Sequence, residues 1–124
     1  MPLTISHIDF IPISTQDVER SRAFYLDTLG LPLERDTPSG FEVSGGQVTL
    51  GIWQPESFGM PFQPTPNALA LHVDDVPAAR AELEGKGVTF HGDTADTTVC
   101  HMAFFSDPDG NALMLHHRYA PLSD

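Results

Sequence analysis

The 124-residue sequence contains one cysteine, few positive charges and no long apolar run, and each shortage argues against a class of protein. A single residue, Cys100, excludes an internal disulfide and is typical of a reducing cytoplasm, where we expect the protein to reside. Six Lys and Arg stand against 17 Asp and Glu, a formal charge of −11. Nucleic acid is therefore not an expected partner, because phosphate binding needs a cationic face.

Membrane association is also not expected. No apolar segment approaches the ~20 residues that a spanning helix needs. The first residues have neither the basic start nor the apolar run of a signal peptide. What the chain does contain is 40% hydrophobic residues, 9% of the chain being aromatic, which is typical of an ordered globule. The length predicts one domain over residues 1–124.

A loose internal repeat organises the chain. The segment 17–23, DVERSRA, recurs as 75–81, DVPAARA. Asp75 follows Asp17 by 58 residues, and Arg80 follows Arg22 by the same interval. Twice this interval spans nearly the whole chain, so the sequence predicts two copies of one structural unit.

Both copies predict the same order of elements. A strand-like run, 5–13 or 68–73, precedes a helix with Asp17 or Asp75 as its N-cap. Gly30 and Gly85 are expected to end the helices. Further strands are expected near 33–36, 40–43 and 47–53 in the first copy, and near 88–91, 99–105 and 112–117 in the second.

The predicted fold class is therefore α+β, with two tandem βαβββ modules at about 4–53 and 67–118. A proline-rich connector, 54–66, joins them. One helix covers only one face of a four-stranded sheet, so we expect the two modules to pair and enclose a cavity. The segment 107–111, Asp-Pro-Asp-Gly-Asn, predicts a tight turn between the last two strands, because these residue types suit turn backbones.

Three passages resemble one known superfamily. They are Ser6-His7-Ile8, the segment 17–31 (DVERSRAFYLDTLGL) and the segment 104–115 with its turn. Together they resemble the vicinal oxygen chelate superfamily of glyoxalases, bleomycin-resistance proteins and extradiol dioxygenases. The resemblance implies a cupped β-sheet barrel, usually completed in a homodimer, and one divalent metal ion held by His and Glu side chains.

The positions at which this resemblance implies metal ligands are mostly not ligand residues here. His7 matches the first ligand and is the candidate metal residue. The other positions hold Ala68, Met114 and, in the first module, a residue near Leu50. A thioether replaces a carboxylate poorly at a hard-metal site, whereas methionine fills apolar pockets well. His72 is about 13 Å along the strand from Ala68, too far to share its coordination sphere. No metal cofactor is favoured.

A displaced histidine site stays open as an alternative. His116 lies two residues beyond Met114 and faces the same way. If the first and last strands of the second module run side by side and parallel, His72 and His116 would meet. They would form a catalytic or ligand-binding pair, with His101 and Asp9 as candidate third members.

An apolar and aromatic pocket is the favoured interpretation. A proline-rich connector lies at the surface and has no structural need for several large apolar groups, and Trp and Phe rings stack on planar ligands. The predicted ligand-binding residues are Trp53, Phe58, Met60, Phe62, Met102, Phe104, Met114 and His116.

The leading functional hypothesis is a homodimeric small-molecule binding protein of the bleomycin-resistance type. It would sequester an aromatic or cationic natural product without metal and so give antibiotic self-resistance. The alternative is a metal-dependent lyase, isomerase or dioxygenase that uses His7 with relocated histidines and Fe, Mn, Ni or Zn. A third possibility is a metal-free enzyme with His72 or His116 as general base.

Overall fold

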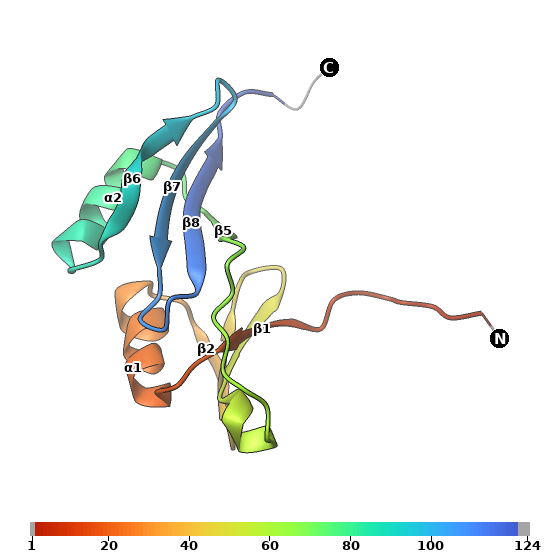
Figure 1. The fold of residues 1–124 in the computed structure, drawn as a ribbon. Helices are drawn as coiled ribbons and strands as arrows, with labels where there is room; N and C mark the ends of the chain where they lie inside the picture. The colour runs from red at the N-terminus through yellow and green to blue at the C-terminus, as the bar shows by residue number, and fades with distance from the viewer. Residues whose placement is uncertain (1, 122–124) are drawn as a thin grey trace. The chain divides into compact units, whose positions relative to one another are not determined.

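The computed structural model describes residues 2–121 and contains two four-stranded mixed sheets, each with its own helix (Figure 1). In both modules the first strand pairs in parallel with the last strand, and the other pairs are antiparallel. The strand orders are β1-β4-β3-β2 and β5-β8-β7-β6. The predicted α+β class with two tandem modules is confirmed, and the two compact units divide between Phe62 and Gln63.

The elements alternate as the repeat predicts. The first module contains β1 (Phe10–Ser14), α1 (Val18–Arg22), η1 (Ala23–Thr28), β2 (Leu33–Thr37), β3 (Gly40–Ser44), β4 (Thr49–Trp53) and the short 3₁₀ helix η2 (Pro55–Phe58). The second contains β5 (Leu69–His72), α2 (Val76–Gly85), β6 (Phe90–Asp96), β7 (Cys100–Ser106) and β8 (Ala112–Arg118). Within residues 2–121, the helices are all too short or too polar to cross a membrane.

Both helices begin at the predicted aspartates. The Asp17 carboxylate accepts a hydrogen bond from the Arg20 N–H at 3.1 Å, and Asp75 accepts one from the Ala78 N–H at 3.0 Å. These bonds satisfy N–H groups that have no partner inside the helix. The predicted N-caps are confirmed. Gly30, with φ of +74°, takes the left-handed conformation just after the first helix.

The first helix widens along its length. Its second half, η1, is a π-helix in which the Leu29 N–H donates to the Phe24 carbonyl at 2.9 Å, five residues back. The wider turn allows two adjacent aromatic side chains, Phe24 and Tyr25, to be buried together, with their rings edge to face at 5.2 Å. The helix predicted after Asp17 was expected to be regular, and the structure differs from that expectation here.

The first strand is shorter than predicted. We expected it from Ile5, but β1 begins at Phe10. Its partner β4 begins at Thr49, directly opposite Phe10, so the residues before Phe10 extend beyond the end of the neighbouring strand. A strand needs a neighbour for its backbone groups. The prediction of strand over 5–9 is wrong, and His7 lies before β1.

Each helix covers one face of its own sheet. In the first module α1 contacts β3 and β4, and in the second α2 contacts β6, β7 and β8. Alternate residues of a strand point to opposite faces. The buried strand residues on the helix-facing sides are Ile13, Phe41, Val43, Leu50 and Ile52 in the first module and Phe90, Ala103, Phe105, Leu113 and Leu115 in the second. The opposite face of each sheet, away from the helix of the same module, is called its uncovered face.

The predicted turn before β8 is organised by a buried carboxylate. Asp107, only 5% exposed, accepts hydrogen bonds from the Asp109 and Asn111 N–H groups, both at 2.9 Å, and from the Asn111 side-chain amide at 2.8 Å. The side-chain oxygen Oδ1 of Asn111 in turn accepts a hydrogen bond from the Thr65 N–H at 2.8 Å. Gly110, with φ of +90°, provides the left-handed residue of the turn. The turn therefore fixes the start of β8 to the chain that precedes β5.

We expect Asp107→Ala to lower the free energy of unfolding by about 2 kcal/mol, because buried donors of Asn111 lose their acceptor. Urea denaturation followed by circular dichroism measures this change. Asp93→Ala removes an exposed carboxylate of β6 and serves as the control, with an effect within about 0.5 kcal/mol. Equal stability of the two variants would contradict the role assigned to Asp107.

Candidate functional site

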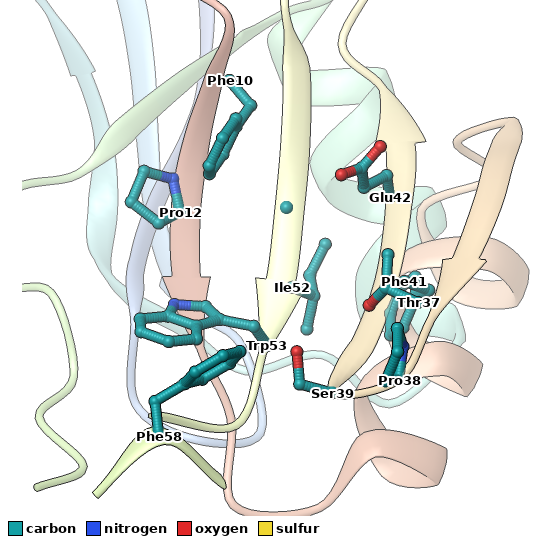
Figure 2. Close-up of a pocket in the computed structure, with 11 residues that line it drawn as sticks. Phe10, Pro12, Thr37, Pro38, Ser39, Phe41, Glu42, Ile52, Trp53 and Phe58 are labelled. Carbon is teal, nitrogen blue, oxygen red and sulfur yellow. The ribbon is translucent and has the colours of Figure 1, made fainter. Parts of the chain in front are cut away.

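A concave pocket lies on the uncovered face of the first sheet (Figure 2). Its volume is about 480 Å³, within the range of small-molecule sites. The strand register places Phe10 and Pro12 of β1, Glu42 of β3, and Gly51 and Trp53 of β4 on the same side. The lining also includes Phe41 and Ile52, although both belong to the buried, helix-facing side. The full lining is Phe10, Pro12, Thr37, Pro38, Ser39, Phe41, Glu42, Gly51, Ile52, Trp53 and Phe58.

Aromatic rings form the walls of this pocket. Trp53, at the end of β4, and Phe58, at the end of η2, have ring centroids 5.3 Å apart and a tilt of 50° between their planes. The ring of Phe10 lies across Gly51, where a Cβ atom would stand 3.1 Å from it. Because Gly51 has no side chain, the Phe10 ring can lie this close to the strand at the pocket. Flat aromatic faces of this kind suit planar ligands.

One ionisable side chain, Glu42, lines the pocket, and it already has a cationic partner. Arg35 of β2 donates from Nε to one Glu42 carboxylate oxygen at 2.9 Å and from a terminal nitrogen to the other at 3.3 Å. This hydrogen bond and the opposite charge raise the pKa of Arg35. The pair compensates the charge of Glu42, so the pocket is mainly an apolar, aromatic surface.

The predicted ligand-binding residues fall into three groups. Trp53 and Phe58 line the pocket of the first module. The connector residues Met60, which is exposed, and Phe62, which is half-buried, are not among the lining residues. The remaining four, Met102, Phe104, Met114 and His116, are half-buried, and the strand register places them together on the uncovered face of the second sheet.

Several pocket residues, chiefly Phe10, Pro12 and Glu42, were not predicted from the sequence. The sequence already indicated that Phe10 and Pro12 share a face, because they lie two residues apart in a predicted strand. The pairing of β1 with β4 was needed to bring them beside Trp53.

The positions at which the resemblance implies metal ligands do not fit a metal centre. His7 is exposed, and its Nε2 lies 3.0 Å from an Asp9 carboxylate oxygen. Leu50 is buried in the helix-facing core. In the second module, Ala68 precedes β5 and Met114 pairs with Ala70 across the neighbouring strand. Of these four positions, only His7 has a donor that borderline divalent metals prefer.

The candidate histidines lie in different places of the second module. His72 and His116 are register partners on the parallel strands β5 and β8, as the alternative hypothesis requires. The imidazole of His72, however, lies near that of His117, with ring centroids 5.6 Å apart. A carboxylate oxygen of Asp74 lies close to both imidazoles. This oxygen and one ring nitrogen from each histidine all lie within 4.8 Å of one another. His117 was not among the candidate residues predicted from the sequence.

His101 belongs to a separate polar group with Asp96 and Tyr119. Its Nε2 lies 3.4 Å from an Asp96 carboxylate oxygen, and its ring centroid is 4.8 Å from that of Tyr119. The Tyr119 hydroxyl donates to Asp96 at 2.6 Å. This bond is the main cause that lowers the pKa of Asp96 and raises the pKa of Tyr119. The group joins the end of β8 to β6 at an exposed position and does not include His72 or His116.

The fold and the pocket together define a protein with two βαβββ modules and an open apolar site. The model of the Glyoxalase/Bleomycin resistance protein/Dioxygenase superfamily matches residues 4–115. The chain belongs to this superfamily, which confirms the resemblance inferred from the sequence motifs.

Individual relatives include proteins with and without a stated activity. The chain is 34% identical to the uncharacterized protein YaeR of Escherichia coli, over 94% of this chain and 99% of the relative. Among solved structures it is similar to TnmS3, an antibiotic binding protein from Streptomyces sp. CB03234, with 30% identity, a TM-score of 0.77, and coverage of 94% of this chain and 99% of that one. A superfamily member from Sphaerobacter thermophilus gives 27% identity, a TM-score of 0.77, and coverage of 92% and 98%.

Proposed function

We propose that this protein binds and sequesters an aromatic small molecule, without metal, as antibiotic-resistance proteins of the bleomycin-resistance type do. The observation that carries the proposal is the pocket on the uncovered face of the first sheet, with Phe10, Trp53 and Phe58 as its walls. Similarity to an antibiotic binding protein supports the same class of function. A cytoplasmic location would suit such a role.

The chemistry of the pocket favours a planar, largely apolar ligand. The lining offers ring faces for stacking, and Gly51 adds no side chain to it. Glu42 is already paired with Arg35, so attraction of a cation would come mainly from the net charge of −11. We therefore infer that aromatic character contributes more to affinity than positive charge does.

The residues at the implied metal-ligand positions also support the proposal that the small molecule is bound without the metal ion of the superfamily. Leu50, Ala68 and Met114 provide no imidazole or carboxylate at the positions where the resemblance implies ligands. An enzyme that relies on that metal would need at least three donors at these places.

We also propose that the protein works as a homodimer. The segment before β1 exposes Leu3, Ile5 and Ile8, each more than 70% accessible. Contiguous exposed apolar side chains are typical of interfaces, and β1 lies at an edge of its sheet. Sedimentation equilibrium tests this part: a dimer that dissociates in a Leu3→Ser, Ile5→Ser, Ile8→Ser variant is expected, and a wild-type monomer would contradict it.

Calorimetric titration with two matched probes tests the binding function. Proflavine is a planar three-ring cation, and phenazine is a neutral three-ring compound. We expect both to bind, along with members of a panel of cytotoxic natural products, because stacking dominates. Phe58→Ala should weaken binding about tenfold, through the loss of one stacking face.

Phe62→Ala is the matched control, since Phe62 belongs to the same connector but does not line the pocket. Its affinity should stay within about twofold of the wild type. Failure of the whole panel to bind in the micromolar range, or an equal loss in both phenylalanine variants, would refute the proposal.

A further inference from the structure

We propose that His72, Asp74 and His117 form a binding site for one divalent transition-metal ion on the second module. Its three residues are not among those that line the proposed ligand pocket. It is also distinct from the four positions at which the superfamily resemblance implies metal ligands. The observation that carries the inference is the convergence of two imidazoles and one carboxylate, with ligand atoms all within 4.8 Å of one another.

The distances between these ligand atoms are close to the distances between two ligands of one bound ion. Metal–nitrogen and metal–oxygen bonds of about 2.0–2.2 Å place two ligands of the same ion about 3–4 Å apart. The Nε2 atom of His72 already lies 3.2 Å from the Oδ1 atom of Asp74. Both of these side chains are exposed, at 68% and 98%, so they can rotate by the small amount needed to close on an ion. His117 is the less accessible member and provides the fixed side of the site.

The fold holds the three residues together by backbone pairing. His72 ends β5, and the pairing with β8 continues past it, because the Val73 N–H donates to the His116 carbonyl at 3.1 Å. Asp74 follows at once, and the next residue, Asp75, is fixed as the N-cap of α2. His117 lies within β8, which has neighbours on both sides. The ligands therefore come from paired strands and a short anchored loop.

A buried atom of His117 gives independent support. Its Nδ1 is buried and has no hydrogen-bond partner within the described part of the chain. Buried ring nitrogens are normally paired. A metal ion is one partner that an unprotonated ring nitrogen can take, and coordination through either nitrogen fixes the tautomer of the ring.

The donor set selects the kind of ion. Imidazole suits Zn²⁺, Ni²⁺, Co²⁺ and Cu²⁺, whereas Mg²⁺ and Ca²⁺ prefer sites built from oxygen atoms. The net charge of −11 raises the local concentration of any cation. Three protein ligands leave at least one coordination position for water.

Calorimetric titration of the untagged, chelator-treated protein with Zn²⁺ alone, and separately with Ni²⁺ alone, tests the site. We expect saturable binding of one ion per chain and no comparable binding of Mg²⁺. His72→Ala and His117→Ala should each weaken binding at least about tenfold, because loss of a ligand costs no less than loss of a residue supporting one. Asp74→Asn should weaken it less.

The matched controls are His116→Ala, next to His117 on β8, and His91→Ala on β6, which should stay within about twofold of the wild type. Because His72 is exposed, its variant keeps the proposal testable if His117→Ala is unstable. Absence of saturable Zn²⁺ and Ni²⁺ binding would overturn the proposal. So would equal losses in the control variants, or a site that disappears with His7→Ala instead of His72→Ala. These outcomes do not depend on the titration with aromatic probes.

Discussion

Replacing Gly40 with alanine is expected to destabilise the protein by about 3 kcal/mol or more. A Cβ atom at Gly40 would stand 1.9 Å from the Ile52 carbonyl oxygen and 3.0 Å from the Trp53 Cα. Both neighbours are backbone atoms, so the clash cannot be relieved by a side-chain rotation. The start of β3 would have to move away from β4, which disrupts the pairing of Gly40 with Trp53. Such overpacking belongs among the severe single-residue changes.

The same substitution at Gly85 is the control, and we do not expect it to lower the free energy of unfolding. Gly85 is the last residue of α2, and a Cβ atom there would meet nothing within 4 Å. Alanine in a helix is favoured over glycine by about 0.5–1 kcal/mol, so Gly85→Ala should be neutral or slightly stabilising. Urea denaturation of the two variants measures the difference. A Gly40→Ala protein as stable as Gly85→Ala would show that β3 and β4 do not approach as described.

The second large effect is expected on ligand binding, from Gly51→Val. The valine side chain would project into the pocket floor and push the Phe10 ring, which a Cβ atom alone would approach to 3.1 Å. Phe10 is half exposed and can move outward, so the fold should tolerate the change. The added side chain would take up part of the pocket beside Phe10. We expect the affinity for proflavine and phenazine to fall at least about 100-fold, which corresponds to about 2.7 kcal/mol.

Thr49→Val is the control for this variant. Thr49 lies on β4, two residues before Gly51 and on the same face, but it is not part of the pocket lining. Its substitution introduces the same side chain outside the site. The calorimetric affinity of Thr49→Val should match that of the wild type, and a comparable loss in both variants would place the binding site elsewhere.

The parts of the fold that could be predicted are those that depend on residues close together in the sequence. Asp17 and Asp75 precede helical stripes and have side chains suited to N–H groups, so their role as caps follows from chemistry within three residues. The Asp107–Asn111 turn is local in the same way. The start of β1 could not be predicted like this. The apolar residues from Ile5 to Phe10 resemble strand, but the strand begins only where Thr49 provides a neighbour.

In the candidate site, too, some residues could be predicted from nearby sequence, whereas others depend on contacts between distant parts of the chain. Phe58 was expected as a ligand-binding residue because aromatic side chains are unusual in a surface segment rich in proline, and Trp53 directly precedes that segment. Phe10 joins them only through the parallel pairing of β1 with β4, which no short motif encodes. His117 was missed because strand alternation directed attention to His116. The ring of His72 lies near that of His117 at the end of an edge strand, a matter of side-chain conformation.

We propose that the first-module pocket binds an aromatic small molecule without metal, and Trp53 provides a direct reporter of this binding. Trp53 is the only tryptophan of the chain and lines the pocket. Its fluorescence should therefore report binding during titration with phenazine in the presence of EDTA. The account predicts saturable quenching at one ligand per chain, largely abolished in Gly51→Val and retained in Thr49→Val. Quenching that does not saturate, or that requires an added metal ion, would contradict it.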